Sequence, residues 1–440
     1  MRILIFVDCY YPSIKSGAKL IHDLAVELSC RGHHAVVVTP SDGISQRLQI
    51  CTEDGVTVAR VKTPRIKGTH KIHRALSELQ FSSRIWHAAE SFLRQNPCDL
   101  ILFYSPTIFF GEIVGKLKKL WQCPAYLILR DIFPDWAVDA GVLRKGLIYH
   151  FFRRIAVKQY QIADVIGVQS PANLDHFARA FPREKFELRV LFNWTDLRSE
   201  LVRTNYRERL GLNEKIVFLY GGNMGVAQDM DNILRLAARL LPRQDIYILL
   251  VGEGSEMPRL SKSIERNRLT NVRIVPGLTQ EDYLSLVSEF DVGLISLDAR
   301  LKTQNIPGKL LSYLHWGLPV LASINPGNDL VDLLHESHAG LCVPNGDDEQ
   351  LCYAALQLAD DANLRNSMKI NARRLLEQRF SVGSAVDHVF EHLSQARVLS
   401  SSSHYISQLH SSELAERVLV SPSKQGTRFL QPNEPMRRVL

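Results

Sequence analysis

The regular alternation of short apolar runs with amphipathic helical patterns constrains the fold of this chain more than any other feature of its sequence. Such an alternation indicates βαβ units and parallel sheets. In the first half we expect strands at Arg2–Val7, Ala35–Thr39, Thr57–Val61, Leu100–Phe103, Ala125–Leu129, Asp164–Val168 and Leu188–Phe192. In the second half we expect them at Ile216–Tyr220, Ile246–Val251, Val272–Val275, Val292–Ile295, Pro319–Leu321 and Gly340–Val343.

A charged segment, TDLRSELVRTNYRERLGLNEK, divides this alternation in two. Because the strands are too many for one open sheet, we expect an α/β protein with two Rossmann-like, doubly wound domains facing a cleft. The expected domains are residues 1–196 and 215–378, followed by a C-terminal helix over 379–396. Residues 397–440 change to Ser, Gln, Pro and Arg with little periodicity, so we predict a disordered tail.

Net charge, cysteine content and the length of apolar runs indicate which partners and which cell compartment suit this chain. The net charge of +7 favours anionic partners, which include phosphates, nucleic acid and acidic membranes. Seven scattered cysteines without a Cys-x-x-Cys pair favour a reducing cytoplasm. The apolar run Ile3–Val7 is too short for a signal peptide, and no run approaches the roughly 18 apolar residues of a spanning helix. We therefore expect a cytoplasmic protein that does not cross a bilayer.

Glycine-rich turns follow two strands of the second half. YGGNMG places Gly222, Asn223 and Gly225 after a strand, and VGEG places Gly252 and Gly254 after the next. Such turns can cradle a phosphate, or they can only shape the chain. The spacing is not G-x-G-x-x-G, and no acidic residue stands where a nicotinamide ribose needs one.

The stretch QNIPGKLLSYLHWGLPVLAS (Gln304–Ser323) is the strongest candidate for an anion site. Pro307 suits the first position of a helix, Gly308 permits close approach, and Lys309 adds an ammonium to the same place. The alternative is a solvated lysine at a helix start. The DMD of Asp229–Asp231 resembles a metal motif, but acidic residues are favoured in a first helical turn, so we expect no metal site there.

Two loops of the first half carry further candidates. Lys15, Gly17 and Lys19 follow the first strand and suit an anionic group, although charged loops are often only solvated. LRDIFPDW places Arg130 and Asp131 directly after a strand. A carboxylate at this edge could act as a general base, or it could cap the following helix.

Basic residues interleave with aromatic and aliphatic ones between Arg60 and Gln95. This composition favours an anionic membrane surface. RNA would also be attracted, but no nucleic-acid-binding module accompanies the segment, so we expect no nucleic-acid partner. The alternative is an ordinary helix with its apolar face inward.

Several motifs together carry a family resemblance. SGAKLIHDLAVELSCRGHHAVVVT (Ser16–Thr39) follows the pattern GGAxxxxxLAxxLxxRGHxVxVxT, and NWTD, VGEG, DVGLISL and GLPVLAS follow in order. From Met1 to about Leu393 the chain resembles the family-four glycosyltransferases. GNMGVAQDMDN and IPGKLLSYL resemble the narrower WbuB-like subgroup of O-antigen assembly, regarded as L-fucosaminyltransferases.

The resemblance implies the GT-B architecture, with the helix over 379–396 returning to the first domain. It implies a nucleotide-sugar donor in the second domain, an acceptor on the first, and transfer with retention and without a metal or other cofactor. The donor phosphate is then expected to help deprotonate the acceptor, while the protein neutralises the leaving diphosphate.

The sequence departs from the wider family at several site positions. The usual Arg and Lys of the second domain become Asn223 and Gln228, and the usual Glu-x7-Glu becomes Gln304 and Ser312. The usual His of the first domain aligns with Arg130. The resemblance therefore implies that Lys309, the glycine turns, and Lys15, Lys19 or Arg130 bind the diphosphate in place of the missing cations. Ser312 would face the ribose.

We therefore expect a peripheral enzyme at the inner face of the cell membrane, in lipopolysaccharide O-antigen or capsule assembly. It would move a UDP-activated deoxyamino sugar, L-FucNAc by the subgroup resemblance, to a polyprenyl-diphosphate-linked saccharide. Asp131 is the candidate for orienting or deprotonating the acceptor hydroxyl. The alternatives are a UDP-sugar 2-epimerase on the same fold and a non-catalytic partner subunit of a glycosylation complex.

Overall fold

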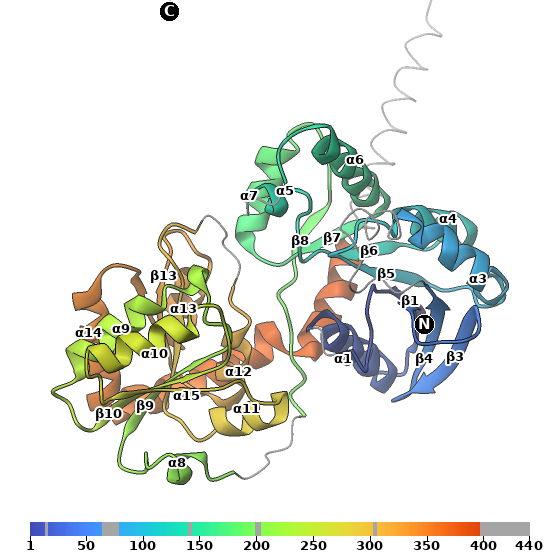
Figure 1. The fold of residues 1–440 in the computed structure, drawn as a ribbon. Helices are drawn as coiled ribbons and strands as arrows, with labels where there is room; N and C mark the ends of the chain where they lie inside the picture. Colours follow the sequence, from blue (N-terminus) through green and yellow to red (C-terminus); the bar gives the residue numbers. More distant parts are fainter. Residues whose placement is uncertain (14–15, 64–78, 140–142, 199–203, 302–305, 397–440) are drawn as a thin grey trace, which may run out of the picture. The chain divides into compact units, whose positions relative to one another are not determined.

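The computed structural model describes residues 1–13, 16–63, 79–139, 143–198, 204–301 and 306–396, and these residues form two parallel-sheet α/β domains (Figure 1). The predicted tail over 397–440 lies outside the described residues. Within the described part of the chain, no helix combines the length and apolar character needed to span a bilayer.

The first domain is built on an eight-stranded sheet in the order β3-β4-β2-β1-β5-β6-β7-β8. Its strands are β1 (Arg2–Phe6), β2 (His34–Ser41), β3 (Leu48–Glu53), β4 (Val56–Lys62), β5 (Leu100–Tyr104), β6 (Ala125–Ile128), β7 (Val165–Val168) and β8 (Leu188–Val190). Its helices are α1 (Ser16–Cys30), α3 (Phe81–Gln95), α4 (Gly111–Trp121), α5 (Asp135–Asp139), α6 (Leu147–Ile162) and α7 (Pro171–Ala180).

The central strands of this sheet are buried along almost their whole length. All five residues of β5 and all four of β6 and β7 are buried, as expected for parallel strands with helices on both faces. The seven expected strands of this half are present. The sequence prediction missed β3, which pairs antiparallel with β4 at the edge of the sheet.

The second domain is built on a six-stranded sheet in the order β11-β10-β9-β12-β13-β14, with every pair parallel. In chain order this is 3-2-1-4-5-6, the doubly wound arrangement, and its order reverses between β9 and β12. The strands are β9 (Ile216–Gly221), β10 (Ile246–Val251), β11 (Val272–Val275), β12 (Val292–Ser296), β13 (Val320–Ile324) and β14 (Gly340–Pro344). The helices are α8 (Tyr206–Arg209), α9 (Met230–Leu240), α10 (Met257–Arg266), α11 (Gln280–Val287), α12 (Lys309–Trp316), α13 (Leu330–Ser337), α14 (Asp348–Asp360) and α15 (Ala362–Leu375).

A π-helical turn over Leu376–Phe380 follows α15, and residues 382–396 are again helical. Side chains of this last helix contact residues of the first half of the chain. Arg31 Nη1 donates to Asp387 Oδ1 over 2.5 Å, and the Tyr126 hydroxyl lies 2.9 Å from His392 Nδ1. The domain boundaries expected from the sequence stay a prediction.

The basic segment of the first domain does not present its apolar residues to solvent where the structure describes it. Phe81, Ile85 and Trp86 of α3 are buried in the core of the first domain. Lys116 stacks on the Trp86 ring, with its Nζ 3.7 Å from the ring centroid. Helix α3 therefore matches the alternative of an ordinary helix with its apolar face inward. Residues 64–78 of the basic segment lie outside the described residues, so a membrane role of that segment stays a prediction.

Candidate functional site

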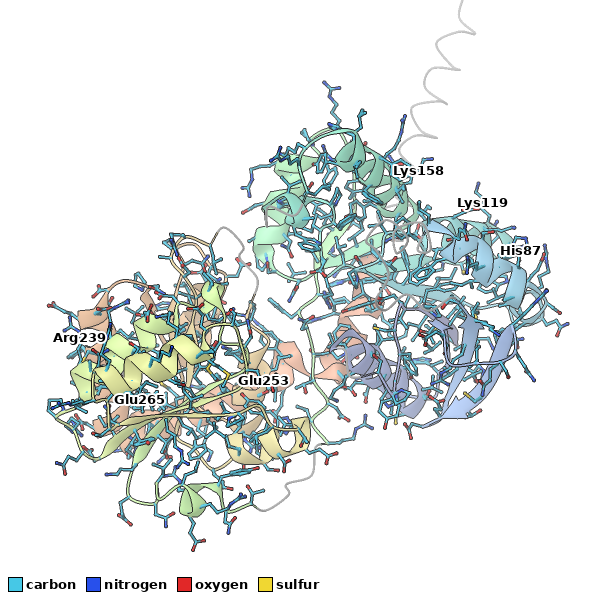
Figure 2. The ribbon with its side chains drawn as sticks, viewed as in Figure 1. His87, Lys119, Lys158, Arg239, Glu253 and Glu265 are labelled. Atoms are coloured by element: carbon cyan, nitrogen blue, oxygen red, sulfur yellow. The ribbon has the colours of Figure 1, made fainter. Side chains whose placement is uncertain are left out.

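The two glycine turns of the second domain pack against each other at the carboxyl edge of the sheet. Gly222 N–H donates to Val251 O over 2.8 Å, and Met224 N–H donates to Glu253 O over 2.7 Å. Glu253, labelled in Figure 2, lies in the turn after β10. These two turns therefore form one unit held by backbone hydrogen bonds.

Glycine is required by the fold at two positions of this unit. A Cβ on Gly252 would lie 2.0 Å from Gly222 O, and a Cβ on Gly254 would lie 2.2 Å from Met224 O. Gly252 also has φ of +147°, which L side chains rarely adopt. The close approach of the two turns accounts for both glycines. Their contact with a donor stays a prediction.

Asn223 and Gln228, which replace two cations of the wider family, bind each other. Gln228 Oε1 accepts from Asn223 Nδ2 over 3.0 Å and from Gly225 N–H over 3.1 Å. The pair thus fixes the end of the first glycine turn through neutral hydrogen bonds. It adds no charge at the place where the wider family has an Arg and a Lys.

Helix α12 places Lys309 beside this turn. Lys309 Nζ lies 3.4 Å from the centroid of the Tyr220 ring, and its Cε is 3.8 Å from the position of a Cβ on Gly222. Among the residues that the structure describes, no carboxylate pairs with this ammonium. Burial lowers the pKa of Lys309 well below its ordinary value. A desolvated cation without a counter-ion is a strong site for an anion.

Gly308 differs from the glycines of the turns. Its φ is −60°, which every residue can adopt, and a Cβ there would meet no protein atom within 4 Å. The fold therefore gives no reason for glycine at this position. Pro307 precedes it, and Ser312 lies one turn after Lys309 on the same side of the helix, half-buried. Gln304 lies outside the described residues.

These features meet at the topological switch point of the second sheet. The turn with Gly222 follows β9, and α12 with Lys309 follows β12, so the two flank the place where the strand order reverses. Ligands of doubly wound sheets bind outside the carboxyl ends of the strands at this place. The helix dipole of α12 adds partial positive charge at its first residues. The structure thus brings Gly222 and Lys309 together at one edge of the sheet, and the positive charge there can attract an anion.

The acidic residues of DMD have structural partners. Asp231 pairs with Arg259 over 2.8 Å, and Asp229 lies 4.0 Å from Arg235. Asp229 has φ of +39° and ends the short turn before α9. Their positions agree with the structural interpretation of the motif.

In the first domain, Asp131 and Asp8 follow two strands of the same sheet, β6 and β1. Desolvation raises the pKa of Asp131, the Asp8 carboxylate raises it further, and Arg130 lowers it. A carboxylate with a raised pKa is better matched to accept a proton at neutral pH. Gly17 packs closely against the Tyr104 ring at this edge, since a Cβ on Gly17 would lie 3.0 Å from that ring.

The other cations predicted for the first domain are engaged within the fold. Arg130 is buried and donates to the carbonyls of Leu129, Leu191 and Phe192. Burial lowers the pKa of Arg130 to about 10. Lys19 pairs with Asp23 over 2.8 Å along α1, and Lys15 lies outside the described residues. A phosphate role for these three stays a prediction, whereas Lys309 has no such partner among the described side chains.

Sequence analysis missed two residues of these edges. Tyr220 is the last but one residue of β9 and supplies the ring under Lys309, and Asp8 raises the pKa of Asp131. Tyr220 is the last residue of one predicted strand, and Asp8 directly follows another. Both positions lie at the carboxyl edge of a parallel sheet. That position was a usable signal for both.

Comparisons with known proteins agree with this architecture. Residues 17–194 match the glycosyl transferase 4-like domain, and residues 215–361 match the glycosyl transferases group 1. WcaI of Escherichia coli K12, named for colanic acid biosynthesis, is 24% identical over 347 residues, which is 72% of this chain and 82% of WcaI. The alpha-monoglucosyldiacylglycerol synthase of Streptococcus pneumoniae is 22% identical over 339 residues, which is 74% of this chain and 72% of that protein.

Solved structures share the fold. Anabaena HepE in complex with UDP and glucose matches with a TM-score of 0.61 and 18% identity over 89% of this chain and 99% of HepE. The chain therefore has the GT-B fold, as the sequence predicts.

Proposed function

The chain belongs to the glycosyltransferases, with a 4-like first domain and a group 1 second domain, and on that premise we propose that the protein is a retaining enzyme that uses a UDP-sugar as its donor. The donor sugar is a deoxyamino sugar, with L-FucNAc as the first candidate. The acceptor is a saccharide linked to polyprenyl diphosphate, in the assembly of O-antigen or capsule. The enzyme works at the cytoplasmic face of the membrane, where such an acceptor lies.

The observation that carries this proposal is Lys309 beside the glycine turn, where no carboxylate of the described residues pairs with its ammonium. In transfer, the bond between the sugar carbon and the diphosphate oxygen breaks, and negative charge grows on the leaving UDP. Lys309 and the positive end of the α12 dipole face that charge from the switch point. Preorganised positive charge of this kind lowers the barrier without a metal ion.

Asp131 is the proposed partner of the acceptor. As the new bond forms between the acceptor oxygen and the sugar carbon, the acceptor hydroxyl loses its proton. Asp131 orients this hydroxyl or takes its proton, and its raised pKa suits both tasks. The donor phosphate is the other base in reach of such a proton.

Product mass spectrometry tests the proposal. The purified chain is mixed with a panel of UDP-sugars and a short polyprenyl-diphosphate acceptor that carries GlcNAc or FucNAc, without added metal. The expected result is a mass gain of one sugar with one of the donors. Binding of a UDP-sugar without any product would contradict the proposal and favour a non-catalytic partner subunit. Turnover of UDP-GlcNAc without an acceptor would favour the epimerase.

A further inference from the structure

The start of helix α6 exposes large apolar side chains. Leu147 is 91% exposed, Ile148 61% and Phe151 51%. Leu147 and Phe151 are one turn apart and therefore share a face of the helix. Side chains of this size and exposure on adjacent turns mark a surface that binds something apolar.

Aromatic rings extend this apolar surface to α5. Trp136 is 44% exposed, and its ring centroid lies 6.3 Å from that of Phe133. Phe133 lies 5.3 Å from Phe152, which in turn lies 5.4 Å from Phe151. A continuous row of rings thus joins Trp136 to the exposed start of α6.

Basic residues surround the apolar ones. Arg144 and Lys145 are exposed just before α6, and Arg154 and Lys158 are exposed further along it. Arg154 and Lys158 lie seven and eleven positions after Leu147, so they continue the same face. Figure 2 labels Lys158 on this helix. In the described part of the chain, none of these four forms an ion pair with a carboxylate.

A hollow of about 480 Å³ opens beside these cations. Its lining includes Arg153 and Arg154 of α6 and Arg183 after α7. Arg153 is held in place, since its Nη2 donates to Ala180 O over 2.5 Å and its guanidinium lies 4.8 Å from the Phe181 ring centroid. The hollow therefore offers three guanidinium groups, of which that of Arg153 is fixed, against the single carboxylate of Glu184.

We infer that this surface, defined by Trp136, residues 144–158 and Arg183 and here called the α6 surface, docks the protein on an anionic lipid bilayer. Apolar side chains of an interfacial helix enter the acyl boundary while its cations contact lipid phosphates. Pairing with a second copy is disfavoured, because it would bring the same four cations of both chains together. The inference deepens the proposed function, since a lipid-linked acceptor lies in such a bilayer.

Vesicle co-sedimentation of the full chain tests this inference. The vesicles contain phosphatidylglycerol with phosphatidylethanolamine, and neutral phosphatidylcholine vesicles serve for comparison. The variants are Leu147→Ser with Phe151→Ser, and Arg154→Gln with Lys158→Gln. Their controls are Tyr353→Ser with Ile370→Ser, which are 64% and 62% exposed in the second domain, and Lys262→Gln with Arg266→Gln on α10.

We expect both α6 variants to bind anionic vesicles at least about tenfold more weakly than the wild-type chain, and both controls to bind like it. Added salt should weaken vesicle binding by the wild-type chain and by the Leu147→Ser, Phe151→Ser variant. It should weaken binding by the Arg154→Gln, Lys158→Gln variant less. Equal binding by wild-type and α6 variants that keep the wild-type melting temperature would overturn the inference. So would a wild-type dimer in sedimentation velocity that the α6 variants break, since the surface would then be an interface between copies.

Sugar transfer to the short acceptor, measured on the same samples, separates this inference from the proposed function. Vesicle binding that depends on α6, without sugar transfer, keeps the inference and contradicts the proposed function. Sugar transfer by a chain that does not bind anionic vesicles would support the proposed function and contradict the inference.

Discussion

Two glycine-to-alanine substitutions should have opposite effects, because the fold requires one glycine and not the other. In Gly252→Ala the new Cβ would lie 2.0 Å from Gly222 O and 2.8 Å from its carbonyl carbon. The two glycine turns must then separate. Overpacking costs about 1–3 kcal/mol, and a side chain at φ of +147° adds about 1–3 kcal/mol. We expect a loss of about 2–6 kcal/mol in the free energy of unfolding.

Gly308→Ala should leave the fold as stable or stabilise it by about 0.4–1 kcal/mol, because φ is −60° and no protein atom lies within 4 Å of the new Cβ. The methyl group would instead lie where the donor diphosphate approaches. We expect the Kd for UDP to rise at least about tenfold, which corresponds to about 1.4 kcal/mol.

Urea denaturation followed by circular dichroism measures the stability of both variants, and isothermal titration calorimetry with UDP measures binding. A Gly252→Ala chain as stable as the wild type would refute the account of the glycine turns. A Gly308→Ala chain that binds UDP with wild-type affinity would refute the account of α12.

The further predictions concern four single side chains. Asp131→Asn should abolish sugar transfer without loss of UDP binding. Asp8→Asn should lower the pKa of Asp131. Because activity that needs the Asp131 carboxylate is lost as pH falls through its pKa, the acidic limb of the kcat/KM profile should then move to lower pH. Arg130→Met should destabilise the fold by about 2–4 kcal/mol in urea denaturation, because it leaves buried carbonyls such as that of Leu191 without a donor. An unchanged stability would contradict that role. Tyr220→Leu should weaken UDP binding about twofold to thirtyfold, because it removes the ring under Lys309, a contact worth about 0.5–2 kcal/mol. Tyr220→Phe keeps the ring and should bind UDP almost normally. Equal losses in the two variants would exclude the ring as the cause.

The sequence predicted the two sheets well, because parallel strands buried on both faces are short continuous apolar runs. It missed β3 because that edge strand, LQICTE, has no continuous apolar run, and none of its residues is fully buried. The Asp54-Gly55 pair that joins β3 to β4 is a hairpin signal, and it was sufficient to find the strand.

The site was predicted only in part. The coincidence of Gly308 and Lys309 was visible in the sequence, but the requirement for Gly252 and Gly254 depends on backbone contacts between two turns. The exposure of the apolar residues on α3 and α6 could not be predicted for a similar reason. Both α3 and α6 mix basic and apolar residues, and only tertiary packing decides that Trp86 is buried and Leu147 is exposed.

The most direct test of the central claim is UDP binding by Lys309→Met, with Lys262→Met on α10 as the matched control. The account predicts that the Kd rises at least about tenfold for Lys309→Met alone. It also predicts an equal or higher melting temperature, because burial that lowers the pKa of Lys309 makes its charged form costly to fold. That cost is present below the lowered pKa and fades as pH rises through it, so the difference in melting temperature should shrink at alkaline pH. Wild-type affinity for UDP in the Lys309→Met chain would contradict the account.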